Sequence, residues 1–187
     1  MNGVPSGRRL FETPWFAIEE IPSRPEWNMG GQPFYLLTGP DHVVIVPLTP
    51  EGKLVMVRQF RPARAALTLE FPAGGVEPGE SPAMAALREF REETGYEAEQ
   101  WLPIGSSGLA NQRESATVHM FAALGARPRF DPSESGIEIV LATPEDLRRH
   151  ILAGEMDMLV TLGVLSFAKA KLGPPAAGSV VIWGVGA

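Results

Sequence analysis

The chain has 187 residues, no cysteine and a formal net charge of −6. Its length fits one domain with a sizeable core, and its charged and apolar fractions, 20% and 44%, are ordinary for a globular protein. An acidic chain lacks the basic face that general nucleic-acid binding requires. The sequence also has no apolar run long enough for a membrane span or a signal peptide. We therefore expect a cytoplasmic protein that binds neither nucleic acid nor membranes, and the absence of cysteine fits a reducing compartment.

Short runs of β-branched or alternating apolar residues, bounded by turn residues, predict β-strands along the chain. We expect short strands within 15–37, then strands at 43–48, 54–60, 67–71, 98–104, 117–124 and 137–142. The sequence Thr-Pro-Glu-Gly between 43–48 and 54–60 favours a turn, so these two strands should form a hairpin. Residues 1–13 carry no such pattern and are expected to be flexible.

Helical signals occur in three places: at 82–94, from the N-cap residue Thr143 to about 152, and within 156–172. Because helices and strands interleave, we predict an α/β (α+β) fold in which a mixed β-sheet is sandwiched between helices. We divide the chain into an N-terminal segment 1–40, a main domain 41–172 and a tail 173–187. The apolar run 180–185 in the tail is either loosely held or paired with a strand.

The helix at 82–94 has well-defined ends. Ser81 is a good N-cap, Pro82 suits the first helical position, and Gly95 suits a left-handed C-cap. We expect an apolar stripe to anchor this helix on the core while its acidic face looks into a cleft. The predicted stripe consists of Ala83, Ala86, Leu87 and Phe90.

Three carboxylates, Glu89, Glu92 and Glu93, fall on one face of this helix. They repel one another unless a cation lies between them, and hard divalent cations prefer oxygen ligands. Arg88 lies one turn before Glu92, so it can pair with that carboxylate and orient it. The alternative is a solvated, charged helix face with no ligand. The spacing favours a metal platform preceded by a glycine-rich loop.

The segment 74–96 resembles the Nudix box at Gly74, Glu80, Arg88, Glu89, Phe90, Glu92, Glu93, Gly95 and Tyr96. The resemblance implies a Nudix fold and hydrolysis of a nucleoside diphosphate linked to another group, with Mg²⁺ or Mn²⁺ as cofactor. It implies Glu89 and Glu93 as principal metal ligands, Glu92 as a contributor and the carbonyl of Ala73 as a further ligand. Chemically, cations can neutralise the diphosphate and activate the attacking water.

The flanking segments 57–61 and 69–75 resemble the ADP-ribose pyrophosphatase group within this family. That resemblance implies a homodimer supported by β-structure in the N-terminal segment, with a site shared between subunits. Arg58, Gln59 and Arg61 are then candidates for contact with the diphosphate or the terminal ribose, to which arginine is well suited. Glu70 either hydrogen-bonds substrate or supports the loop. The alternative is that all four are ordinary polar residues of strands and loops.

The segment 106–115 does not settle which substrate is cleaved. The resembling group usually carries a proline here, and this chain has none. Gln112 and Arg113 either face the substrate or lie on a surface loop. The reading we favour is cleavage of ADP-ribose to AMP and ribose 5-phosphate, and the alternatives are GDP-mannose or another nucleotide sugar. A non-catalytic Nudix-fold sensor is a third, different class of function.

A general base is expected on a late loop. Glu134 lies in the turn-rich segment 131–136, which suits a residue that closes over bound substrate. Glu138 begins a predicted strand and is a candidate for base or metal ligand. Glu114 is a third candidate for the base.

Overall fold

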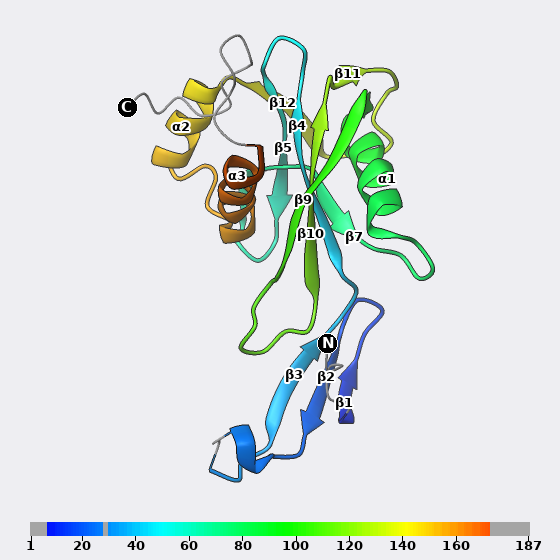
Figure 1. Ribbon diagram of the computed structural model, residues 1–187, viewed down its shortest axis with the longest axis vertical. Helices are drawn as coiled ribbons and strands as arrows, with labels where there is room; N and C mark the ends of the chain where they lie inside the picture. Colours follow the sequence, from blue (N-terminus) through cyan, green and yellow to red (C-terminus); the bar gives the residue numbers. More distant parts are fainter. Residues whose placement is uncertain (1–6, 28–29, 173–187) are drawn as a thin grey trace.

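The computed structural model describes residues 7–27 and 30–172 (Figure 1). A seven-stranded mixed sheet lies between α1 (Pro82–Thr94) on one face and α2 (Pro144–Leu152) and α3 (Leu159–Leu172) on the other (Figure 1). This arrangement confirms the predicted α/β sandwich.

The main sheet has the order β12-β5-β4-β10-β9, with β6 paired to β5 and β7 paired to β4. Its strands are β4 (His42–Leu48), β5 (Leu54–Arg61), β6 (Ala66–Glu70), β7 (Ala73–Gly75), β9 (Gln100–Gly108), β10 (Thr117–Leu124) and β12 (Ile137–Ala142). The pairing of β10 with β4 is parallel, and the other pairings are antiparallel. A separate two-stranded sheet joins β8 (Tyr96–Glu97) to β11 (Arg127–Pro128).

The predicted hairpin of β4 and β5 is paired only at its turn, where Leu48 faces Leu54. Beyond that point the two strands separate, and the chain from β6 to β7 fills the gap between them. The Ile45 N–H donates to the Pro72 carbonyl at 2.9 Å, so the backbone groups that the split frees are still paired. The split therefore places β7, which leads into the loop before α1, in the middle of the sheet.

Alternation along β4 sends its side chains to two separate cores. Val43 and Ile45 pack with Phe90 beneath α1, whereas Val44 and Val46 pack with residues of α2 and α3 on the opposite face. All four are buried, which explains why this strand is a continuous apolar run in the sequence.

The N-terminal part of the chain forms its own antiparallel sheet, which extends from one end of the main sheet (Figure 1). Its strands are β1 (Arg8–Glu12), β2 (Ala17–Ile21) and β3 (Phe34–Thr38), with a 3₁₀ turn η1 (Pro25–Trp27) between β2 and β3. The expectation that 1–13 would be flexible is therefore wrong for Arg8–Glu12, because β1 pairs along its length with β2. The predicted role of this segment in dimerisation stays a prediction.

Within 7–27 and 30–172, no helix is long and apolar enough to cross a membrane. The predictions about the apolar run 180–185 lie outside the described residues.

Candidate metal and catalytic site

Helix α1 begins and ends where the sequence predicts. The Met84 N–H donates to the Ser81 hydroxyl at 3.3 Å, and Pro82 occupies the first turn. Gly95 has a φ of 70° and donates its N–H to the Arg91 carbonyl at 2.8 Å, as in a left-handed C-cap. These caps fix the length of the helix that carries the box carboxylates.

The rotation of α1 differs from the predicted apolar stripe. Ala86 and Phe90 are buried as expected, but Ala83 and Leu87 are exposed. The buried face instead includes Glu89 and Glu93, which are 8% and 3% exposed. The helix turns its carboxylates toward the sheet because the facing strand β7 leaves space for them.

That space is created by Gly74. A Cβ atom at this position would lie 2.0 Å from the Glu89 side-chain carbon, closer than any real contact. Next to it, the Ala73 N–H donates to Glu93 at 3.0 Å. The carboxylates of α1 are therefore set against the backbone of β7, beside the Ala73 carbonyl that the resemblance implied as a ligand.

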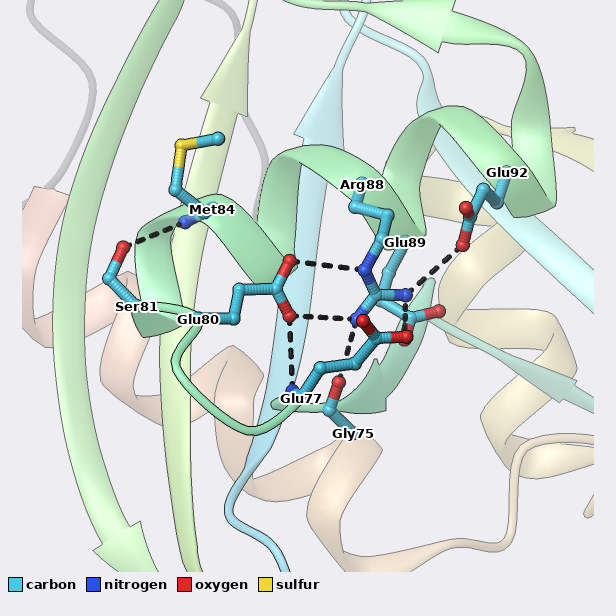
Figure 2. A network of polar contacts seen from close by, with 8 residues as sticks. All are labelled: Gly75, Glu77, Glu80, Ser81, Met84, Arg88, Glu89 and Glu92. Carbon is cyan, nitrogen blue, oxygen red and sulfur yellow. Dashed lines mark hydrogen bonds and ion pairs between the residues drawn. The ribbon is translucent and has the colours of Figure 1, made fainter.

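Arg88 is the centre of a network on the outer side of these carboxylates (Figure 2). Its guanidinium donates twice to Glu80, at 3.0 and 3.1 Å, and to Glu89 and Glu92 at 2.8 and 3.1 Å. It also donates to the Gly75 carbonyl at 2.9 Å. The predicted Arg88–Glu92 pair is thus present, and one planar group joins the box loop to two carboxylates of the helix.

Glu134 joins the site from the loop between β11 and β12. One carboxylate oxygen each from Glu89, Glu92 and Glu134 lies within 4.8 Å of the other two. This all-oxygen set suits a hard divalent cation such as Mg²⁺ or Mn²⁺. The structure therefore brings together residues that are far apart in sequence and that were predicted separately as ligands and base.

The local electrostatics favour a bound cation. The pKa of Glu93 is raised to about 8, chiefly because burial disfavours the charged form and also because Glu134 and Glu89 lie nearby. Burial also raises the pKa of Glu89, although the neighbouring Arg88 acts in the opposite direction. Crowded, desolvated carboxylates of this kind are stabilised in their ionised form by a positive ion.

Arg61 and Glu70 form a second polar group next to β7. Two guanidinium nitrogens of Arg61 donate to the two carboxylate oxygens of Glu70, at 2.9 and 2.6 Å. Glu70 is only 1% exposed and also accepts a hydrogen bond from the Thr68 hydroxyl. This fork holds the Arg61 guanidinium in one orientation.

Both residues line a cavity of about 480 Å³ that also touches Ala73, Gly74 and Gly75. The lining also includes Met158, which precedes α3, and Val160 and Thr161 from its first turn. A mostly apolar cavity of this size with a few polar groups is typical of a small-ligand site. The α3 residues were missed in the sequence, because a helix that is apolar on all sides gives no signal of which face lines a cavity.

Several predicted site residues lie apart from the acidic cluster and this cavity. Arg58 forms ion pairs with Glu138 at 3.1 Å and with Glu155 at 3.3 Å. Two predicted site residues, Arg58 and Glu138, therefore bind each other. Gln59 is half-buried in β5, opposite Ile137 and Thr68.

Gln112 and Arg113 are exposed in the loop between β9 and β10. The Arg113 guanidinium lies 4.6 Å from the ring centre of Phe34, and its backbone carbonyl accepts from the Leu37 N–H at 2.7 Å. This loop therefore contacts the N-terminal sheet. Glu114, the third candidate for the base, belongs to the same loop and forms a β-bridge with Leu37.

Comparison with known proteins identifies the class of this chain. The NUDIX domain model matches residues 39–159, which is more than half of the chain. The chain therefore belongs to the NUDIX family, as the box predicted, and the prediction of a Nudix hydrolase is confirmed.

Individual relatives narrow the comparison. An ADP-ribose pyrophosphatase of Bacillus subtilis (strain 168) is 32% identical over 137 residues, which are 71% of this chain and 74% of that protein. An ADP-sugar pyrophosphatase of Mus musculus is 33% identical over 127 residues, 63% of this chain and 58% of that protein, so the match spans little more than half of the mouse protein. A crystal structure of an ADP compounds hydrolase superposes with a TM-score of 0.73 at 19% identity, covering 88% of this chain and 90% of that one. This last likeness confirms the fold.

Proposed function

We propose that this protein hydrolyses the diphosphate bond of ADP-ribose, giving AMP and ribose 5-phosphate. The observation that carries the proposal is the close approach of the carboxylates of Glu89, Glu92 and Glu134, with Glu89 set against the backbone of β7. A diphosphate is anionic, so an acidic site accepts it only through cations. Two relatives are named ADP-ribose pyrophosphatase and ADP-sugar pyrophosphatase, and these names point to ADP-ribose or an ADP-sugar as the substrate.

The cofactor is Mg²⁺ or Mn²⁺, held by Glu89, Glu92 and Glu93 with the Ala73 carbonyl. When bound, such an ion offsets the charge that develops on the phosphate oxygens and lowers the pKa of a bound water. Arg88 holds Glu89 and Glu92 in fixed orientations through the network described above. The assignment of Glu89 and Glu92 rests on the box spacing and on the short distance between their carboxylate oxygens. That of Glu93 and Ala73 rests on the box resemblance and on the contact of Glu93 with the backbone of Ala73.

Glu134 is our candidate for the general base that takes the proton of the attacking water. Its carboxylate lies in the acidic cluster, whereas the carboxylate of Glu138 is held by Arg58. The water oxygen forms a new bond to one phosphorus, and the bridging oxygen leaves with the other phosphate, so that each product carries a terminal phosphate. General bases placed in this way contribute about 10²–10⁴-fold to a rate.

Substrate contacts are assigned by position. Arg61, fixed by Glu70 at the wall of the cavity, is placed to bind the diphosphate or the sugar attached to it. Arg58 and Gln59 lie on the same strand, outside the cavity lining, and remain candidates for substrate contact. Gln112 and Arg113 lie beside the N-terminal sheet and are proposed to approach the substrate of a second subunit.

A homodimer is proposed with the N-terminal sheet as its contact surface. This sheet and the loop after β1 expose aromatic side chains, including Phe11 at 53%, Trp15 at 75% and Tyr35 at 44%. Clusters of exposed aromatic residues are typical of protein interfaces. The cytoplasm remains the location that we expect from the composition.

A panel of substrates with Mg²⁺ tests the proposed reaction. It contains ADP-ribose, ADP-glucose, GDP-mannose and a nucleoside triphosphate, and products are separated by ion-exchange chromatography. ADP-ribose should be cleaved with the highest kcat/KM and give AMP. Preferential cleavage of another nucleotide sugar would keep the reaction and correct the substrate. Tight binding of a nucleotide sugar without cleavage would favour the sensor function instead.

A further inference from the structure

The loop that carries Glu134 is attached to the C-terminal end of α1. The N–H groups of Arg129 and Phe130 both donate to the Gly95 carbonyl at 2.9 Å. Those of Ser133 and Glu134 donate to the Glu92 carbonyl at 3.0 and 3.2 Å. The last carbonyls of a helix have no partner within it, so the loop supplies the missing donors.

One side-chain contact reinforces this attachment. The guanidinium of Arg91 lies over the ring of Phe130, 3.9 Å from its centre, which is the geometry of a cation–π interaction. Among the described residues, no hydrogen bond or ion pair joins a side chain of 129–136 to another part of the protein. Among the hydrogen bonds, ion pairs and cation–π contacts of the described residues, the Arg91–Phe130 stack is therefore the one made by a side chain of this loop, and it adds to the backbone bonds.

Both residues of the stack lie close in sequence to a member of the acidic cluster. Arg91 directly precedes Glu92, and Phe130 lies four residues before Glu134. Arg91 occupies a position of the box segment at which the box defines no residue, so the metal carboxylates do not require an arginine there. The opposite end of the loop is Gly136, which has a φ of 81° and open space around its Cα atom. The position of Glu134 therefore depends on its own N–H bond to Glu92 and on the anchored end of the loop at Phe130.

We propose that Arg91 and Phe130 are positioning residues that hold Glu134 at the metal carboxylates. The inference rests on the proposed function, in which Glu134 is the general base. Without the stack the backbone bonds still form but open more often, which widens the range of Glu134 positions. Because a displacement of about 1 Å can reduce a rate by as much as 10²-fold, turnover should fall while the metal ligands on α1 stay in place.

Steady-state kinetics with ADP-ribose and Mg²⁺ compare Phe130→Ala, Arg91→Ala and Phe130→Tyr with the natural protein. We expect the first two to lower kcat about tenfold with KM within about twofold, and Phe130→Tyr to retain kcat because it keeps the ring. Phe167→Ala is the matched control, since Phe167 is a phenylalanine of similar exposure, 38% against 44%, on α3. A kcat within twofold of the natural protein in Phe130→Ala, or an equal fall in Phe167→Ala, overturns the proposal.

The same substitutions in a Glu134→Gln background separate positioning from general damage. If Phe130 acts through Glu134, then Phe130→Ala lowers kcat less than twofold further once Glu134 is replaced. A full tenfold loss in that background overturns the proposal. If Glu134→Gln alone keeps natural turnover, the base assignment fails and this inference fails with it. If Glu134→Gln is impaired and Phe130→Ala is not, only this inference fails.

Amide hydrogen exchange gives a test that does not depend on activity. The N–H groups of Ser133 and Glu134, which donate to Glu92, should exchange several-fold faster in Phe130→Ala than in the natural protein or in Phe167→Ala. Unchanged exchange in Phe130→Ala overturns the proposal even if no substrate has been found.

Discussion

Gly74 and Glu89 approach so closely that a Cβ atom on residue 74 would lie 2.0 Å from the Glu89 side-chain carbon. The glycine of the loop and the carboxylate of the helix therefore form one structural unit. Strand β7 can pass beneath α1 only without a side chain at this point, and the buried carboxylate occupies the space.

Replacement of Gly74 by alanine should displace Glu89 from the acidic cluster. We expect Gly74→Ala to lower kcat about 10²-fold and to raise the Mg²⁺ concentration required for half-maximal activity. A Mg²⁺ titration of activity measures both effects. Gly163→Ala is the control, because Gly163 lies in helix α3 and a Cβ added there would meet nothing within 4 Å. Natural activity in Gly74→Ala would show that Glu89 does not need its present position.

Replacement of Arg88 by methionine removes the group that joins Glu80, Glu89 and Glu92. Leaving these carboxylates without their shared partner should lower the free energy of unfolding and reduce kcat about tenfold. Guanidinium unfolding and steady-state kinetics measure the two effects. Arg148→Met should change neither, because Arg148 is exposed and its contact with Glu145 measures 4.0 Å. If Arg88→Met were as stable and as active as the natural protein, Arg88 would have no role in holding these carboxylates.

The two candidate bases can be separated by single substitutions. Glu134→Gln should reduce kcat by about 10²-fold or more, since the carboxylate can no longer accept a proton. Glu138→Gln should have a small effect, because that carboxylate is held by Arg58 outside the acidic cluster. The reverse order of the two losses would assign the base to Glu138, and equal small losses would exclude both.

The Asp146 carboxylate should make the unfolding free energy of the metal-free protein depend on pH in the acidic range. The Thr143 hydroxyl and backbone N–H donate to this carboxylate, and they lower its pKa from 3.8 to about 2. Because the folded state binds the proton less tightly than the unfolded state, the contribution is complete above about pH 5 and is lost as the pH falls through 3.8 toward 2. The difference in unfolding free energy between the natural protein and Asp146→Asn should therefore shrink between roughly pH 5 and pH 2. A difference that stays constant over this range would contradict the shift.

The sequence predicts the parts of this site that depend on neighbours in the chain. The caps Ser81 and Gly95 define α1 because their interactions are local, and the spacing of Glu89 and Glu92 follows from helical geometry. The rotation of α1 is not local. It depends on the close approach of Gly74, a contact across the β7–α1 interface, which is why Leu87 was expected to be buried and is exposed.

Long-range contacts also explain what the sequence left open. Glu134 and Glu138 are equivalent as acidic residues in a late segment, and only the folded loop places one of them beside Glu92. The strand β1 was missed because its residues are exposed on both faces, so the apolar alternation that indicates a strand is absent. Its pairing with β2 supplies the order that the pattern does not show.

The most direct test of the central claim is AMP release from ADP-ribose by the natural protein and by Glu93→Gln, measured with and without Mg²⁺. Glu93→Gln keeps the size of a buried side chain that lies beside Ala73 but removes its negative charge. The natural protein should release AMP only with the metal, and Glu93→Gln should retain about 1% of that activity or less while remaining folded. AMP release that is independent of Mg²⁺, or equal in the two proteins, would contradict the account.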